Sequence, residues 1–282
     1  AFGGLLAVNG VFIYVARNLD SVLIGRYWGA ESLGYYTRAY FLMLLPSTIA
    51  TSVLANLMVP SLAALQDQPE RFGLAYRRAV RVVAFVGCPL ALGLALTASE
   101  AVQIVYGPEW LPVVPMLVWL SIAGITQPIY NTTGWLFTAK AKAGLYLNLT
   151  LVNALVLLVA FWIGVRSGPL GVAQAYGLVM GLLLLWPALA LAHRAGGLEL
   201  RETLRSVWPV AICLLVLVIA VGSVWLMAAW LGIDWRIVFA MKVIAGVVAY
   251  GLASRRWARQ LLIDDVIPML PEALGARVMR IM

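Results

Sequence analysis

The chain has 282 residues, of which 63% are hydrophobic and only 11% are charged, and its mean hydropathy is +0.94. Soluble domains carry about 25% charged residues, so this composition excludes an ordinary soluble protein. The net charge of +8 would suggest a nucleic-acid partner for a soluble protein. In a membrane protein, basic cytoplasmic connections facing anionic lipid headgroups explain it, so we expect membrane lipids and no nucleic acid as partners.

Apolar stretches long enough to cross a bilayer follow one another along the whole chain. A spanning helix needs roughly 20 predominantly apolar residues. By that criterion the sequence predicts an all-α, polytopic membrane protein with about eight transmembrane helices. We expect them at residues 3–25, 33–60, 77–105, 112–138, 144–165, 169–193, 207–231 and 235–253.

The connections between these spans alternate in charge. Every second connection and the tail are basic, whereas the others carry little beyond Arg26, Arg166 and Arg236 alongside acidic residues. Because cytoplasmic connections collect Lys and Arg, both termini of this segment are predicted to be cytoplasmic. The basic side chains are those of Arg71, Arg77, Arg78, Arg81, Lys140, Lys142, Arg194, Arg201, Arg205, Arg255, Arg256 and Arg259.

The first span contains an unusual polar run, in which Arg17, Asn18 and Asp20 interrupt an otherwise apolar segment. Ionisable groups at membrane depth are costly and usually face a bundle interior or a wet cavity. Arg17 and Asp20 are three residues apart and can pair on one helix face. Two interpretations stay open. Either Arg17 and Asn18 donate to an anionic or hydroxyl-rich ligand while Asp20 orients the arginine, or the pair is structural.

The second span begins with Tyr35, Tyr36, Arg38 and Tyr40. Tyrosine rings and a guanidinium group suit a sugar or phosphate site. Tyrosines at a membrane interface also form the ordinary aromatic belt. We favour the belt for the tyrosines and a functional role for Arg38.

Polar side chains also lie within the later spans. Gln127 and Asn131 are four residues apart and flank Pro128, so both can face the site of a kink. Lys242 is a single buried charge, which is either a functional cation or faces a groove against a neighbouring helix. We expect His193 to be structural or solvated. The other polar residues within spans fit interhelical hydrogen bonding better than ligand contacts.

Small residues and prolines are frequent in the spans. Gly177 and Gly181 have the small-xxx-small spacing that allows helices to cross closely, and prolines bend helices. Bendable helices suit a transporter that rocks between two states, although they are not specific to one.

Motifs for enzyme chemistry are absent from the sequence. It has no Asp-x-Asp, Gly-x-Ser-x-Gly, His-x-x-x-His or Cys-x-x-Cys motif, and no glycine-rich phosphate loop. The adjacent carboxylates Asp264 and Asp265 lie in the tail, and Cys88 and Cys213 lie in separate spans, where cysteine is usually a small hydrophobe. We therefore expect no enzyme, no metal and no cofactor.

Several runs carry a resemblance to a known family. They are residues 17–26, 28–36, 38–40, 60–67, 69–71, 106–110 (with the turn Gly107-x-x-Trp110) and 168–176. In order and spacing they resemble bacterial polysaccharide-export flippases of the Wzx type, within the multidrug/oligosaccharidyl-lipid/polysaccharide exporter superfamily. The similarity covers roughly residues 1–200.

The resemblance implies a particular organisation. Residues 1–200 would be the carboxy-terminal six-helix lobe of a two-lobe exporter, residues 201–258 two additional transmembrane helices, and residues 259–282 a cytoplasmic tail, partly an interfacial helix. The amino-terminal lobe is missing from this sequence, which opens at Ala1 as if within a helix of a longer protein.

The resemblance also implies a function. It is the flipping of undecaprenyl-diphosphate-linked oligosaccharide repeat units across the bacterial cytoplasmic membrane, for O-antigen, capsule or exopolysaccharide synthesis. The implied partners are the lipid-linked oligosaccharide, the missing lobe and a glycan polymerase. This lobe would line the substrate cavity with Arg17, Asn18, Asp20, Arg38, Gln127 and Asn131.

Three alternatives remain. A cation-coupled drug exporter of the same superfamily would depend on a buried carboxylate, for which Asp20 is the candidate. A membrane-embedded polymerase or ligase would carry a large external loop, and the external connections here are short. A non-transporting subunit of a glycan-synthesis complex would need the tail from Arg255 but neither Arg17 nor Arg38.

Overall fold

The computed structural model describes residues 2–266; the side chains of a few residues of α1, Arg17 among them, lie outside that description, as does most of the predicted interfacial tail helix. The described chain is almost entirely helical and contains no strand, so the all-α prediction is confirmed. Within it, six helical segments are long and apolar enough to cross a membrane, and two of these have 46 and 54 residues. Since one crossing needs about 20 residues, each of those two can cross twice, and the total of eight stays a prediction.

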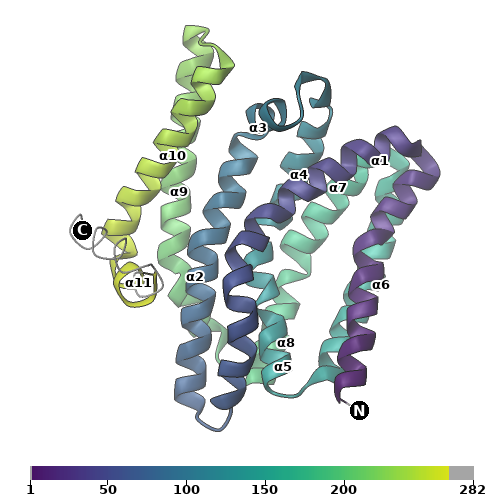
Figure 1. Ribbon diagram of the computed structural model, residues 1–282, viewed down its shortest axis with the longest axis vertical. Coiled ribbons are helices and arrows are strands. Elements are labelled where there is room, and N and C mark those ends of the chain that lie inside the picture. Colours follow the sequence, from purple (N-terminus) through teal and green to yellow (C-terminus); the bar gives the residue numbers. More distant parts are fainter. Residues whose placement is uncertain (1, 267–282) are drawn as a thin grey trace.

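The first long segment, α1 (Phe2–Ala64), reverses direction at Gly29, where φ is 81° and ψ is 179°. Glycine adopts this backbone conformation without the steric cost that a side chain would bring. Figure 1 shows the ribbon rising from the amino terminus, turning at one end of the bundle and descending again. Trp28 holds the turn, because its Nε1 donates to the carbonyl oxygen of Val165 at 2.7 Å. α1 therefore contains the first two predicted spans.

The remaining elements follow the predicted spans, three of which are interrupted. The fourth, 112–138, is broken at Thr132. The third predicted span, 77–105, is broken at Thr97, whose N–H and hydroxyl both donate to the carbonyl oxygen of Gly93. The sixth is interrupted by a π-helical stretch, η3. In chain order the elements are α2 (Pro69–Leu96), α3 (Ala98–Val105), η1 (Pro108–Trp110), α4 (Val113–Asn131), α5 (Thr133–Ala139), α6 (Ala143–Gly164), η2 (Val165–Ser167), α7 (Gly168–Leu178), η3 (Val179–Leu183), α8 (Leu185–Gly196), α9 (Leu200–Leu231), α10 (Trp235–Trp257), α11 (Arg259–Leu261) and η4 (Leu262–Val266).

Close packing joins α7, which contains Gly177, and the following η3, which contains Gly181, to α4. A Cβ atom on Gly177 would collide with the carbonyl oxygen of Trp119, and one on Gly181 would lie 2.9 Å from the backbone nitrogen of Ala123. The two helices can approach this closely only because both positions lack a side chain. The close crossing predicted from the Gly177 and Gly181 spacing is confirmed.

The basic connections meet at one end of the bundle. Arg77 pairs with Glu202 at 2.6 Å, which joins the second connection to the sixth. Lys140, from the fourth, donates to the carbonyl oxygen of Gln66 at 2.7 Å. Figure 1 places the α1–α2 turn, α5, α8 and α11 at this end. The charge alternation therefore corresponds to a real two-sided arrangement, and its cytoplasmic orientation stays a prediction.

The hairpin of α9 and α10 packs against α2 through polar contacts at three levels. Lys242 donates to the carbonyl oxygen of Leu96 at 3.3 Å, Tyr250 donates to the carbonyl oxygen of Phe85 at 2.8 Å, and Glu202 pairs with Arg77 at 2.6 Å. Outside this contact, Lys242 pairs with Glu100 of α3 and Asp265 of η4 pairs with Arg81, both at 2.6 Å. Apolar contacts alone drive helix association weakly in lipid, so these directional contacts fix where the hairpin sits.

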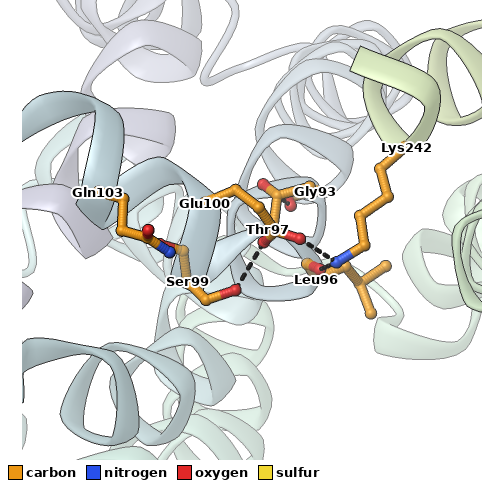
Figure 2. A network of polar contacts seen from close by, with 7 residues as sticks. All are labelled: Gly93, Leu96, Thr97, Ser99, Glu100, Gln103 and Lys242. Carbon is orange, nitrogen blue, oxygen red and sulfur yellow. Dashed lines mark hydrogen bonds and ion pairs between the residues drawn. The ribbon is translucent and has the colours of Figure 1, made fainter. Parts of the chain in front are cut away.

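The description of Lys242 as a single buried charge is wrong. Figure 2 shows its side chain reaching from α10 to Glu100 and to the carbonyl oxygen of Leu96. The side chains of Lys242 and Glu100 are only 4% and 7% exposed. Because 142 positions separate the two residues, no local pattern in the sequence indicates this pair.

Glu100 lies in α3, outside the six candidate spans. Burial alone would raise the pKa of its carboxyl group. Hydrogen bonds from Lys242 and from the hydroxyl of Ser99 outweigh burial and lower that pKa below its ordinary value. The carboxyl group of Glu100 is therefore ionised at neutral pH.

Candidate functional site

A polar cavity of about 110 Å³ lies among α1, α4, α5, α6 and α7. Its lining combines amide groups, hydroxyl groups and aromatic rings, and none of the described residues that line it is charged. The lining residues are Ile13, Gln127, Tyr130, Asn131, Thr133, Tyr146, Thr150, Asn153, Ala154, Leu157, Tyr176 and Met180. Two of the six residues predicted to line a substrate cavity, Gln127 and Asn131, are among them.

Gln127 and Asn131 share one face of α4 because they are one helical turn apart. The Nε2 of Gln127 lies 3.4 Å from Oδ1 of Asn131, and Nδ2 of Asn131 donates to the hydroxyl of Ser47 at 3.0 Å. α4 continues through Pro128, and the break comes after Asn131. The buried Oε1 of Gln127 has no hydrogen-bond partner within residues 2–266, so an acceptor is left for a ligand hydroxyl or water.

α6 supplies the facing wall of the cavity. Asn153 donates from Nδ2 to the hydroxyl of Tyr130 at 2.9 Å, and Tyr146 stacks on Phe137 with ring centroids 5.2 Å apart. Tyr146, Thr150 and Asn153 follow one another at spacings of four and three residues, which places them on one helix face. This spacing is the one signal in the sequence that indicates the α6 wall of the cavity. The hydrogen bond from Asn153 to Tyr130 also joins two helices, as expected for the polar residues within spans.

Asp20 lies deep in the bundle and is 2% exposed. Its carboxylate accepts from the hydroxyl of Tyr36 at 2.6 Å and from the backbone N–H of Ser21 at 2.6 Å. The predicted pairing with Arg17 stays a prediction, because the arginine side chain is outside the described part of the chain. Asn18 is exposed and donates to the carbonyl oxygen of Tyr14 in its own helix at 2.7 Å.

The aromatic-belt interpretation is wrong for Tyr36, which is 0% exposed. The ring of Tyr36 stacks with that of Tyr40 at 6.1 Å, and Tyr40 contacts Tyr176 edge-on at 5.6 Å. Because Tyr176 also lines the cavity, a row of three rings connects Asp20 to the cavity wall. No local pattern in the sequence indicates this row of rings, since Tyr176 lies in a helix far along the chain from Tyr36 and Tyr40.

Arg38 lies elsewhere, beside the turn formed by α3 and η1. Its guanidinium carbon is 5.8 Å from the ring centroids of both Tyr106 and Trp110, within the range of a cation–π contact. Arg38 is exposed and does not line the polar cavity. The predicted residues with described side chains therefore lie in separate places: the cavity, the buried Asp20 cluster and this turn.

His193 has the structural role expected for it. It is buried, with Nδ1 at 2.8 Å from the carbonyl oxygen of Leu189 and Nε2 at 2.9 Å from the hydroxyl of Thr203. Both ring nitrogens are thus occupied, and the histidine joins α8 to α9.

The polar groups of the cavity are of the kinds that contact carbohydrates, and its volume of about 110 Å³ is below the roughly 300–1,000 Å³ of small-molecule sites, so it would enclose only a small part of a glycan. Uncharged amides and hydroxyls exchange hydrogen bonds with sugar hydroxyls, and tyrosine rings pack on sugar faces. An uncharged lining offers little to a diphosphate group, which prefers guanidinium or ammonium partners. The cavity therefore suits a glycan better than a charged carrier headgroup.

The comparisons with known proteins agree with this chemistry. Residues 1–115 match the family described as "Polysaccharide biosynthesis protein". The lipopolysaccharide biosynthesis protein WzxC of Escherichia coli is 24% identical over 73% of this chain and 42% of its own length. The teichuronic acid biosynthesis protein TuaB of Bacillus subtilis is 29% identical over 51% of this chain and 30% of its own length. The chain spans less than half the length of these relatives.

A solved structure shares the fold. The lipid II flippase MurJ, in an inward closed conformation, matches with a TM-score of 0.69 at 15% identity, over 90% of this chain and 53% of that one. The chain therefore shares its fold with about half of that structure.

Proposed function

Given that the resemblance to Wzx-type polysaccharide-export proteins is confirmed, we propose that this chain is the carboxy-terminal lobe of a flippase with two additional helices. Its cargo is an oligosaccharide repeat unit on an undecaprenyl diphosphate carrier, which crosses the bacterial cytoplasmic membrane. The amino-terminal lobe, absent from this sequence, completes the transport pathway. A glycan polymerase is the partner that receives the product.

The observation that carries this proposal is the uncharged polar cavity within a membrane bundle. Polar groups at membrane depth are costly unless they are paired or functional. Here Gln127, Asn131 and Asn153 converge with Tyr130 on one space, and the oxygen of Gln127 is left without a described partner. Sugar hydroxyls are the ligands that would satisfy such a lining, while the isoprenoid chain stays in lipid.

The test is complementation by the full-length gene in a strain that lacks its own repeat-unit flippase. We expect Asn131→Ala and Asn153→Ala to reduce surface glycan by roughly 10-fold, because each removes hydrogen bonds to the cargo. Asn148→Ala is the matched control, since Asn148 lies on the exposed side of α6. Equal export by all three variants, at equal protein levels, would contradict a role of the cavity in transport.

A cation-coupled exporter remains the second candidate, favoured by the buried carboxylate of Asp20. If Asp20 binds a transported cation, Asp20→Asn should abolish the dependence of export on the ion gradient. The hydrogen bonds from Tyr36 and Ser21 favour a structural role instead. In that case the variant lowers protein stability and leaves the ion dependence of the remaining export unchanged.

A further inference from the structure

A second and larger cavity, of about 420 Å³, lies at the end of the bundle that carries the basic connections. α2, α9, α10 and α11 surround it, each with an arginine: Arg81, Arg205, Arg256 and Arg259. These four residues are spread over 179 positions of the sequence, from the second connection to the tail, so the fold has gathered them. Trp257 and one acidic residue, Asp264, also line the space.

Acidic side chains of the described residues do not balance the charges of this cavity. The buried carboxylate of Asp265 pairs with Arg81 at 2.6 Å and with Arg78 at 2.9 Å, so that acidic group already has partners. Arg205, Arg256 and Arg259 have no ion-pair partner between residues 2 and 266. Three guanidinium groups therefore border one cavity in which Asp264 is the one acidic lining residue of the described chain, and an anion would relieve their repulsion.

The guanidinium groups and the size of the cavity indicate which kind of anion it would bind. Guanidinium groups bind phosphate through paired, parallel hydrogen bonds. The cavity is larger than a single ion needs and falls within the size range of small-molecule sites, about 300–1,000 Å³. The exposed rings of Trp257, the last residue of α10, and of Trp208, in the first third of α9, suit the depth of lipid headgroups.

We propose that this arginine cavity binds the phosphate headgroup of an anionic lipid in the leaflet that faces the basic end. The lipid would join α9, α10 and α11 to α2, adding an electrostatic contact to the Asp265 pairs. This inference does not rest on the proposed cargo, because it follows from the arginines that line this cavity and holds for any lipid that carries a phosphate. The shared chemistry is a phosphate on a membrane anchor, whether the lipid is a phospholipid or an isoprenoid phosphate.

Two triple variants of the full-length protein test the proposal. Arg205→Gln/Arg256→Gln/Arg259→Gln removes the unpaired arginines of the cavity. Arg194→Gln/Arg201→Gln/Arg255→Gln removes the same charge from exposed arginines that do not line it. Purified proteins in detergent micelles would be titrated with phosphatidylglycerol and with phosphatidylcholine, and bound lipid counted by native mass spectrometry.

We expect the parent and the matched triple to bind phosphatidylglycerol at least about 10-fold more tightly than phosphatidylcholine, and the cavity triple to lose this preference. Farnesyl diphosphate that displaces phosphatidylglycerol at lower concentration would identify an isoprenoid carrier as the occupant; failure to displace it would identify a phospholipid. Inorganic phosphate binding as tightly as either lipid, or equal losses in both triples, would overturn the proposal.

A milder variant serves as the control for misfolding of the cavity triple. Arg205→Lys keeps the charge and removes the guanidinium fork, so it should keep the melting temperature of the parent while weakening phosphatidylglycerol binding. Unchanged binding in this variant and in Arg259→Lys would overturn the proposed recognition of phosphate by paired guanidinium hydrogen bonds.

Discussion

Tyr36 and Asp20 illustrate how a single hydrogen bond can define a buried region. Both side chains are almost fully buried, and the tyrosine hydroxyl donates to the carboxylate at 2.6 Å. A buried polar group that loses its partner is penalised by about 1–3 kcal/mol. The hydroxyl is therefore needed to keep Asp20 where it is.

Tyr36→Phe should lower the free energy of unfolding by about 1–3 kcal/mol, since it removes the donor and leaves the carboxylate less satisfied. Thermal unfolding in detergent would measure the change. Tyr35→Phe is the control, because the hydroxyl of Tyr35 contacts only the exposed Glu31, at 3.2 Å. If the two variants melt at the same temperature, the Tyr36 hydroxyl does not stabilise the bundle.

The buried pair of Glu100 and Lys242 gives a second prediction at this scale. Removing one partner leaves an uncompensated charge, which costs about 3–5 kcal/mol. Glu100→Gln and Lys242→Met should each destabilise the protein strongly, and the double variant should lose less than the sum. Additive losses would show that the two side chains do not interact.

The same pair makes stability depend on pH. Hydrogen bonds from Lys242 and Ser99 lower the pKa of Glu100 in the folded protein. The stabilisation by ionised Glu100 is therefore complete above the ordinary glutamate pKa of about 4.3. It is lost as the pH falls through the lower folded value. The difference in melting temperature between the parent and Glu100→Gln should therefore shrink only below that ordinary value. A difference that disappears already at neutral pH would contradict this origin.

At the scale of the helices, the crossing of α7 over α4 depends on the absence of side chains. Gly177→Ala would force a methyl group against the carbonyl oxygen of Trp119 and should destabilise the bundle by about 1–3 kcal/mol. Gly93→Ala is matched to it, because a Cβ at Gly93 meets nothing within 4 Å. Melting temperatures that fall equally would argue against a tight crossing.

At the scale of the whole molecule, the two-sided charge pattern predicts topology. With Cys88 and Cys213 replaced by alanine, single cysteines at Lys142 and Arg255 should react with an impermeant thiol reagent only from the cytoplasmic side. A cysteine at Asp234 should react only from outside, since the α9–α10 turn lies at the other end of the bundle (Figure 1). The opposite labelling pattern would invert the orientation.

The sequence predicted the helices better than it predicted the site. Apolar length acts locally and indicated where the helices lie, although α2 and α9 begin eight and seven residues before the predicted spans. The Gly177 and Gly181 spacing correctly predicted a close crossing. The partners of Lys242 and Arg38 lie on other helices or turns, so no local pattern shows them. Gln127 and Asn131 were found because one helix turn carries both, whereas Tyr176 reaches the cavity from another helix.

The three polar contacts between the hairpin and α2 also limit how the protein can move. One contact would leave the hairpin free to swivel in the membrane plane, and two would leave it free to turn about the line between them. Three at different levels oppose such rotation, so we expect α2, α9 and α10 to move together. Any rocking during a transport cycle must then occur at another boundary, and a cross-link between α2 and α9 should leave export intact.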